Sequence, residues 1–234
     1  MIPLRDDAPR WTTPYVTRVL IGLNVLVFLY QFTLYLGDPR VGDAFVQGFG
    51  SVPAKISAAF AGRYPVDAAF LPVFTSMFLH GGWLHLIGNM WFLSIFGDNI
   101  EDELGHLPYL LFYLTCGVIA SVAHYLANPL SVIPAVGASG AISGVMGAYM
   151  VRFPWARIVT LIPLFFFFTT IELPAVIMLF YWFFIQFASG AASLGMEGGG
   201  VAWWAHIGGF VAGAVWIWTR PRRRRRQPQH VFYY

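Results

Sequence analysis

The chain has 234 residues, of which 58% are hydrophobic and only 11% are charged, and its formal net charge is +3. Soluble domains carry roughly a quarter charged residues, so the composition excludes an ordinary soluble domain and indicates a membrane protein. The length allows roughly six membrane-spanning helices of about 20 residues each, with their connections. The single cysteine, Cys116, excludes an intrachain disulfide framework.

The N-terminal part predicts a polar tail, one span and a long loop. Residues 1–14 are polar and are expected to form a loose tail, and Val16 to Leu36 is long and apolar enough for the first span. The run is longer than a signal-peptide core and has no small-residue cleavage site, so we expect it to be retained. Gly37 to Leu79 is too charged to span a membrane and too apolar for a linker, which predicts a partly helical loop against the bilayer surface.

The second predicted span, Leu84 to Ile100, carries two polar residues four positions apart. This spacing places His85 and Asn89 on one face of a helix. Polar groups inside a membrane are energetically expensive, so the pair indicates either a mutual hydrogen bond or a functional site. His80, next to two glycines, is expected to structure the preceding loop.

An acidic cluster separates the second span from the third, which is predicted from Leu107 to Leu126. The cluster consists of Asp98, Glu101, Asp102 and Glu103. Glu101 is a candidate for tying neighbouring loops together, and the other three acids are expected to be solvated at the end of the helix.

The stretch Val136-Gly137-Ala138-Ser139-Gly140 opens a short apolar helix that extends to Val151. One interpretation of Ser139 is a helix cap, because serine is favoured at helix N-termini. The helix is too short to cross about 30 Å of hydrocarbon, so Ser139 is expected to lie below one membrane surface, within the protein. A hydroxyl in that place is a candidate nucleophile if the chain supplies a base.

Ile158 to Phe168 is about half a span in length and is expected to lie along the interface. Glu172-Leu173-Pro174 is typical of a helix start, with an acid near the N-terminus and proline in the first turn. The fifth span is therefore predicted from Leu173 to Ala188.

The sixth span is predicted from Val201 to Trp218, after a loose glycine-rich segment, Gly190 to Gly200, that we expect to act as a mobile lid. It holds His206 near its start. Gly209 and Gly213, four residues apart, permit close approach of another helix, and the helix after Ser139 is the expected partner.

The distribution of basic residues predicts the orientation. A dense basic block follows Arg220, and it is expected to be cytoplasmic and to contact anionic lipid, not nucleic acid. With six spans, 11 of the 14 lysines and arginines lie on the side of both termini, which the positive-inside rule assigns to the cytoplasm. The expected organisation is a cytoplasmic tail (1–14), a six-helix membrane domain (15–219) and a basic cytoplasmic tail (220–234).

This topology places His85, Asn89, Ser139 and His206 at similar depth in the outer half of the membrane. His206 could serve Ser139 as a base, and the Ser139 N–H, the Asn89 amide and the His85 ring could stabilise an oxyanion. No acid is placed to orient His206, so a Ser-His dyad is favoured over a triad. Zinc is disfavoured because His80 and His85 are five residues apart and no HExxH glutamate is present, and no cofactor is expected.

Three motifs in this order resemble those of the rhomboid family of intramembrane serine proteases: His80-x4-His85-x3-Asn89, Gly137-Ala138-Ser139-Gly140 and Ala205-His206-x-Gly208-Gly209. The resemblance extends from the first to the sixth span and implies an all-α membrane protein, a six-helix bundle with an interfacial first loop. It implies Ser139 as nucleophile and His206 as general base and acid, with His85 and Asn89 completing the oxyanion hole.

The resemblance has one departure near the expected site. Many members carry an aromatic residue four positions after the nucleophile, stacked on the base, whereas this chain has Ser143. The motif Gly97-x3-Glu101-x3-Gly105 also resembles a structural element of the family, in which Glu101 would tie loops together.

The expected function is an intramembrane serine endopeptidase of the cell membrane, with its active site open to the extracytoplasmic side. Its expected partners are single-span transmembrane substrates and the lipid bilayer. One alternative is an inactive rhomboid-like module that binds transmembrane segments, against which the intact Ser139 and His206 argue. A small-solute transporter is a third option, but the sequence shows no internal repeat.

Overall fold

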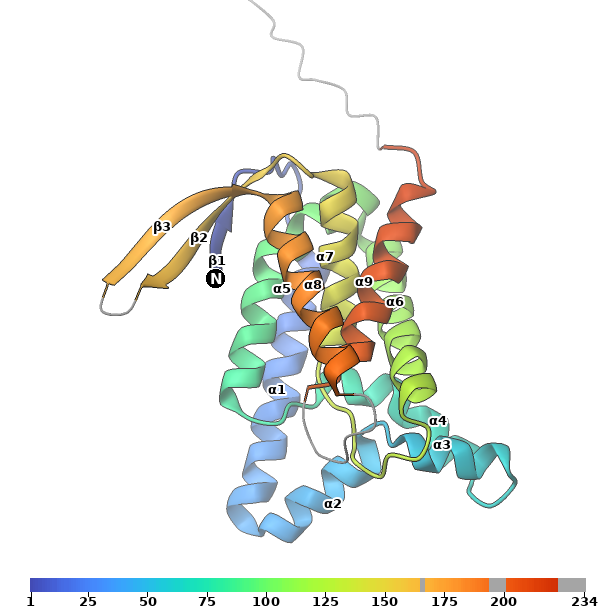
Figure 1. Ribbon diagram of the computed structural model, residues 1–234. Helices are drawn as coiled ribbons and strands as arrows, with labels where there is room; N and C mark the ends of the chain where they lie inside the picture. Colours follow the sequence, from blue (N-terminus) through green and yellow to red (C-terminus); the bar gives the residue numbers. More distant parts are fainter. Residues whose placement is uncertain (165–166, 194–200, 223–234) are drawn as a thin grey trace, which may run out of the picture.

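The structure is a computed structural model that describes residues 1–164, 167–193 and 201–222. Most of this part is helical, with a small sheet at one end of a helical bundle (Figure 1). The elements in chain order are β1 (Ile2–Asp6), α1 (Tyr15–Gly37), α2 (Pro39–Phe49), α3 (Pro53–Phe60), α4 (Val66–Thr75), the 3-10 turn η1 (Ser76–Phe78), α5 (Trp83–Leu104), α6 (His106–Ala127), α7 (Ser139–Arg152), β2 (Arg157–Leu164), β3 (Phe167–Pro174), α8 (Ala175–Ala192) and α9 (Trp203–Trp218).

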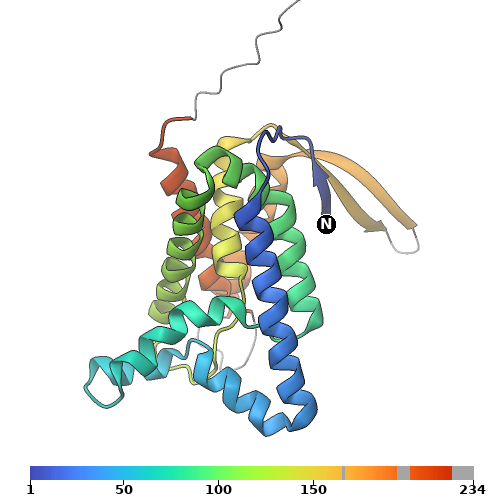
Figure 2. The same ribbon diagram turned by 180° about the vertical axis from the view of Figure 1, so that it is seen from behind.

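Helix α7, which begins at Ser139, is the centre of the bundle. Eleven of its 14 residues are buried, and it contacts α5, α6, α8 and α9. Seen from behind, α1 passes in front of α7 between α5 and α6 (Figure 2). Because the glycines and alanines of α7 present little side chain, four other helices can surround it closely.

Several helices of the bundle have the length and composition of membrane spans. Within the described residues, α1, α6 and α8 are each long and apolar enough to cross a bilayer, and α5 meets the same criteria when it is taken together with the α4–η1 segment, from which it is bent by 75°. Helices α7 and α9 are shorter, at 14 and 16 residues. The chain is therefore a mostly helical, multi-pass membrane protein, and the count of six spans remains a prediction.

The segment between Gly37 and Leu79 is partly helical, as predicted. Helices α2, α3 and α4 gather at the end of the bundle opposite the last turn of α9 (Figure 1). The predicted lid begins later than expected, because α8 continues to Ala192. Residues 194–200 of that lid, and residues 223–234 of the basic tail, lie outside the described residues.

A three-stranded antiparallel sheet corrects two predictions. Residues 2–6, expected to be part of a loose tail, form β1 and pair with β2, for example Ile2 with Leu161. The segment predicted to lie along the interface forms β2 and the start of β3, in a hairpin that projects from the bundle (Figure 1). Strand β2 is rich in β-branched residues, which favour extended backbone over helix.

Helix α8 consequently begins at Ala175 and not at Leu173. Glu172, predicted to lie at a helix start, is in β3, where it pairs with Arg157 across the hairpin at 3.1 Å. Pro174 still marks the boundary, because it is the residue immediately before the helix.

Glu101, near the end of α5, joins the starts of α1 and α6. Its carboxylate accepts hydrogen bonds from the Val16 and Thr17 N–H groups, both at 2.8 Å, and from the Thr17 hydroxyl at 2.7 Å. The Nδ1 atom of His106 lies 2.6 Å from the same carboxylate. Helix α1 has no side-chain cap of its own, so Glu101 provides the acceptor that its first turn lacks.

The expectation that the neighbouring acids are solvated is wrong. Asp102 is buried and accepts hydrogen bonds from the Thr12 N–H and hydroxyl groups. Glu103 pairs with Arg152 of α7 at 3.1 Å, with both side chains largely buried. The cluster therefore ties the N-terminal segment and α7 to α5.

Candidate active site

The turn before α7 places Ser139 at the helix start. Gly137 has a φ of +125°, a backbone conformation that residues with a side chain rarely adopt. Its N–H donates to the Ser76 carbonyl at 2.9 Å. A Cβ atom at position 137 would lie only 2.7 Å from the ring of His85. Both the backbone conformation and the adjacent ring therefore require glycine here.

Ser139 and His206 are in direct contact. The His206 Nε2 atom lies 2.8 Å from the Ser139 Oγ atom, and the histidine side chain is buried. A serine hydroxyl hydrogen-bonded to an imidazole is the arrangement in which the ring can remove the hydroxyl proton. The structure thus brings together the two residues predicted from the sequence as nucleophile and base.

Glycines on α9 and α7 allow this contact, as their spacing predicted. A Cβ atom at Gly209 would lie 2.0 Å from the Gly140 carbonyl oxygen, and one at Gly213 would lie 1.8 Å from that of Gly144. The two backbones therefore approach as closely as glycine permits. This close approach sets the depth and distance at which His206 faces Ser139.

His85 and Asn89 lie beside the same turn. A Cβ atom built at Gly137 would be 2.8 Å from the His85 Nε2 atom and 3.5 Å from the Asn89 Nδ2 atom. The His85 Nδ1 atom accepts from the Gly81 N–H at 3.3 Å, so its proton is on Nε2, the atom that faces Gly137. The Asn89 Nδ2 group is buried and has no hydrogen-bond partner among the described residues. Two N–H donors thus lie beside the turn that precedes Ser139.

His80 belongs to the loop before α5. Its main-chain N–H and carbonyl both bond to the Gln31 side chain of α1, at 3.2 and 2.7 Å. Its buried ring lies against that of His85, with 5.2 Å between the centroids. These contacts agree with the predicted structural role. In the described ranges, no group of three histidine, cysteine or acidic side chains is placed to hold a metal ion.

The sequence reasoning missed Gln186 and Trp182 of α8. The Gln186 Oε1 atom lies 2.7 Å from the His206 Nδ1 atom, and the Trp182 ring lies 5.9 Å from the His206 ring, tilted by 35°. An available signal was Gln186 itself, an amide in the middle of an apolar span, where polar groups are costly unless they have a partner. Ser143, in place of the aromatic residue, donates to the Ser139 carbonyl at 2.6 Å.

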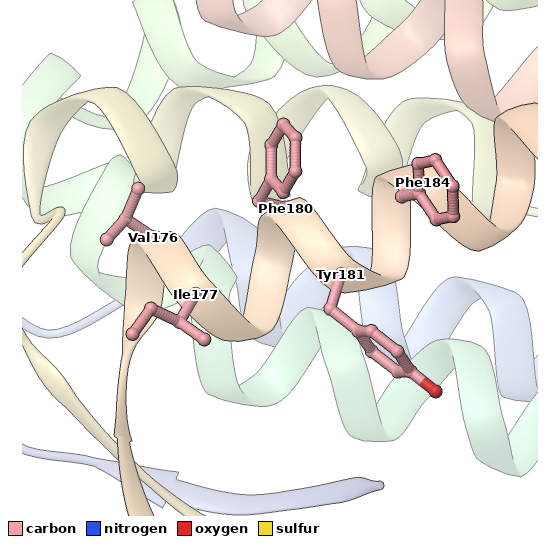
Figure 3. A pocket seen from close by; sticks show the side chains of 5 residues that line it. All are labelled: Val176, Ile177, Phe180, Tyr181 and Phe184. Carbon is pink, nitrogen blue, oxygen red and sulfur yellow. The ribbon is translucent and has the colours of Figure 1, made fainter.

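The outward face of α8 carries an apolar hollow of about 350 Å³ that is separate from this site. Figure 3 shows the five side chains that line it, all from α8: Val176, Ile177, Phe180, Tyr181 and Phe184. None of them is a site residue.

Comparison with known proteins agrees with the motifs. A family model described as Rhomboid domain matches residues 67–223. The human mitochondrial presenilin-associated rhomboid-like protein is 29% identical over 209 residues, which cover 86% of this chain and 46% of that protein. Rhomboid protease GluP of Bacillus subtilis is 31% identical over 137 residues, which cover 58% of this chain and 24% of that protein.

A shorter match is with the chloroplastic Rhomboid-like protein 11 of Arabidopsis thaliana, 39% identical over 82 residues, which cover 35% of this chain and 29% of that protein. The chain spans less than half the length of each of these curated relatives. The family model covers well over half of this chain and includes all the site residues described above. The chain belongs to the rhomboid family.

Proposed function

We propose that this protein is an intramembrane serine endopeptidase in which Ser139 is the nucleophile and His206 the general base and acid. The observation that carries the proposal is the 2.8 Å hydrogen bond between the Ser139 Oγ and His206 Nε2 atoms. The bond joins two helices and lies inside the bundle. Among the relatives, GluP is named a rhomboid protease, which supports the same reaction here.

In the proposed reaction, His206 takes the hydroxyl proton while the Ser139 Oγ attacks a peptide carbonyl carbon. The carbonyl oxygen then becomes an oxyanion, for which the Ser139 N–H, His85 Nε2–H and Asn89 Nδ2–H groups are the available donors. His206 returns its proton to the leaving amine and an acyl-enzyme remains. His206 then takes a proton from a water molecule, which attacks this ester, and returns it to the departing Ser139 Oγ as the second product is released.

The buried Asn89 amide, which has no hydrogen-bond partner in the part of the chain that the structure describes, supports the oxyanion role. A buried donor without a partner costs roughly 1–3 kcal/mol. That cost is recovered only when an acceptor arrives, and the negative oxygen formed in the reaction is a strong acceptor. Donors that are fixed before the reaction stabilise the transition state without reorganising.

We propose single-span membrane proteins as substrates, cut near the outer end of their transmembrane segment. In this proposal both termini are cytoplasmic, in line with the positive-inside rule, and the site opens to the extracytoplasmic side. The substrate then enters sideways from the bilayer. A helix must unwind locally to expose its carbonyl group, so a segment that unwinds easily and offers a small residue at the cut is favoured.

The test uses purified protein reconstituted in lipid vesicles with a model single-span substrate and, separately, a fluorophosphonate probe that reacts with activated serines. We expect the wild type to cleave the substrate and to bind the probe. Ser139→Ala and His206→Ala should lower cleavage by at least about 10⁴-fold, because nucleophile and base act as a unit. A wild type that neither cleaves nor binds the probe refutes the protease and favours the inactive binding module.

A further inference from the structure

We propose that Gln186 is a positioning residue for His206: its amide oxygen accepts the Nδ1–H of the ring and thereby holds the Nε2 lone pair toward Ser139. The inference rests on the proposed function. It names Gln186 as the group that orients His206 where a catalytic triad would have an acid. Gln186 contacts the base and not the reacting atoms, so its effect on cleavage is exerted through His206.

The geometry forms a continuous chain of three side chains from three helices. Gln186 Oε1 on α8 lies 2.7 Å from His206 Nδ1 on α9, and His206 Nε2 lies 2.8 Å from Ser139 Oγ on α7. Only 6% of Gln186 and 9% of His206 is exposed. Both nitrogens of the ring are therefore engaged, and the ring cannot turn over without breaking both hydrogen bonds.

The amide oxygen fixes the tautomer of the ring. A neutral imidazole has one N–H donor and one acceptor nitrogen. Because an amide oxygen can only accept, the proton must be on Nδ1, which leaves Nε2 to accept from the Ser139 hydroxyl. This is the tautomer that a general base requires, and the opposite one would point an N–H at the hydroxyl oxygen.

An amide suits this location better than a carboxylate. Gln186 lies in the middle of α8, a helix with the length and composition of a membrane span. An unprotonated acid there would be an expensive buried charge, whereas a neutral amide with a hydrogen-bond partner costs far less. The chain can thus orient its histidine without a charge inside the membrane.

Trp182 packs beside the same ring. It lies one turn before Gln186 on α8, so both side chains point to the same side of the helix. Its ring is 5.9 Å from that of His206, and Trp203 approaches the ring edge-on at 6.4 Å. Position 143 holds a serine and not an aromatic residue, and α8 supplies both the hydrogen bond and an aromatic contact to His206.

The test compares Gln186→Leu and Gln186→Glu with the wild type, and Phe187→Leu is the matched control because this neighbouring side chain is half exposed. Leucine keeps the size and removes the acceptor, so we expect kcat and the probe-binding rate to fall by about 10–100-fold with little change in KM. Glutamate keeps an acceptor oxygen at the same reach and should restore activity to within about tenfold of the wild type. The control should stay within about twofold.

The pH–rate profile gives a readout that a merely structural role would not change. A glutamate beside His206 stabilises the imidazolium, so the acidic limb of the profile should move to higher pH in Gln186→Glu. Among the residues that the structure describes, the other titratable groups that act on His206 are His85 of α5 and His124 of α6, and both are unchanged in this variant. In the wild type, Ser139 and Gln186, the two side chains hydrogen-bonded to His206, carry no charge.

Each outcome decides the question. If the wild type cleaves and Gln186→Leu cleaves equally fast, the positioning role is refuted and the proposed function stands. If the wild type neither cleaves nor binds the probe, the function and the inference fall together. If Gln186→Leu does not fold, Gln186→Glu decides: an active variant whose pH–rate profile is unshifted refutes the inference.

Discussion

Replacing Gly209 by alanine tests whether the close packing of α9 on α7 holds the reacting pair together. The added Cβ would lie 2.0 Å from the Gly140 carbonyl oxygen, whereas real Cβ contacts below 3.0 Å essentially never occur. The helices must therefore separate by about 1 Å at this point. The Ser139–His206 distance would grow from 2.8 Å to about 3.8 Å, which is outside hydrogen-bond range.

We expect this separation to lower cleavage by about 100-fold, since an error of about 1 Å in a reacting geometry has that effect. Overpacking should also cost about 1–3 kcal/mol of stability. The assays are vesicle cleavage, the rate of fluorophosphonate binding and thermal unfolding in detergent. Gly22→Ala on α1 is the control, because nothing lies within 4 Å of its added Cβ. A folded Gly209→Ala protein with wild-type kcat would refute the reasoning.

Three further measurements probe the frame around the site. Glu101→Gln should lower the melting temperature by several degrees, because each buried donor left without an acceptor costs about 1–3 kcal/mol. Glu172→Gln is the exposed control, and an equal fall in its melting temperature would contradict this reasoning. Burial raises the pKa of Asp6 from 3.8 to about 6, so its contribution to stability is complete below about pH 3.8 and is lost as the pH rises through 6. We expect Asp6→Asn to remove this loss of stability when the melting temperature is measured across that pH range. A variant whose melting temperature falls with pH as much as that of the wild type would contradict this prediction. If both termini are cytoplasmic, position 63 faces the outside of the cell and position 155 faces the cytoplasm. In intact cells an impermeant maleimide should then react with a cysteine that replaces Arg63 and not with one that replaces Trp155. The reverse pattern would overturn the orientation.

The helical part of the fold could be predicted from the sequence because membrane helices have a strong compositional signal. The expected spans agree with α1, α5, α6, α8 and α9 to within a few residues. The contact between α7 and α9 could also be predicted, because two glycines four residues apart have few other uses in an apolar helix.

The sheet could not be predicted in the same way. A short apolar run has the same composition whether it is a strand or an interfacial segment, and β1 is recognisable only through its partner β2. Pairing between residue 2 and residue 161 is a long-range choice that local composition does not encode.

The contact of Ser139 with His206 followed from topology and motif, whereas Gln186 did not. Its side chain reaches His206 only because α8 packs on α9 at one particular rotation. Hydropathy gives the position of a span along the sequence but not the rotation of the helix about its axis. An amide within an apolar span identifies a candidate, and only packing supplies its partner.

The carboxylate of Glu101 has a consequence for the order in which the protein is assembled. The N–H of Val16, in the first turn of α1, is bonded to a residue 85 positions later in the chain. Because α1 precedes α5 in the chain, the Glu101 carboxylate can accept from the Val16 and Thr17 N–H groups only when α5 lies beside α1. The native cap of α1 therefore depends on the helix that carries His85 and Asn89, so the start of α1 is tied to the helix of the candidate oxyanion donors.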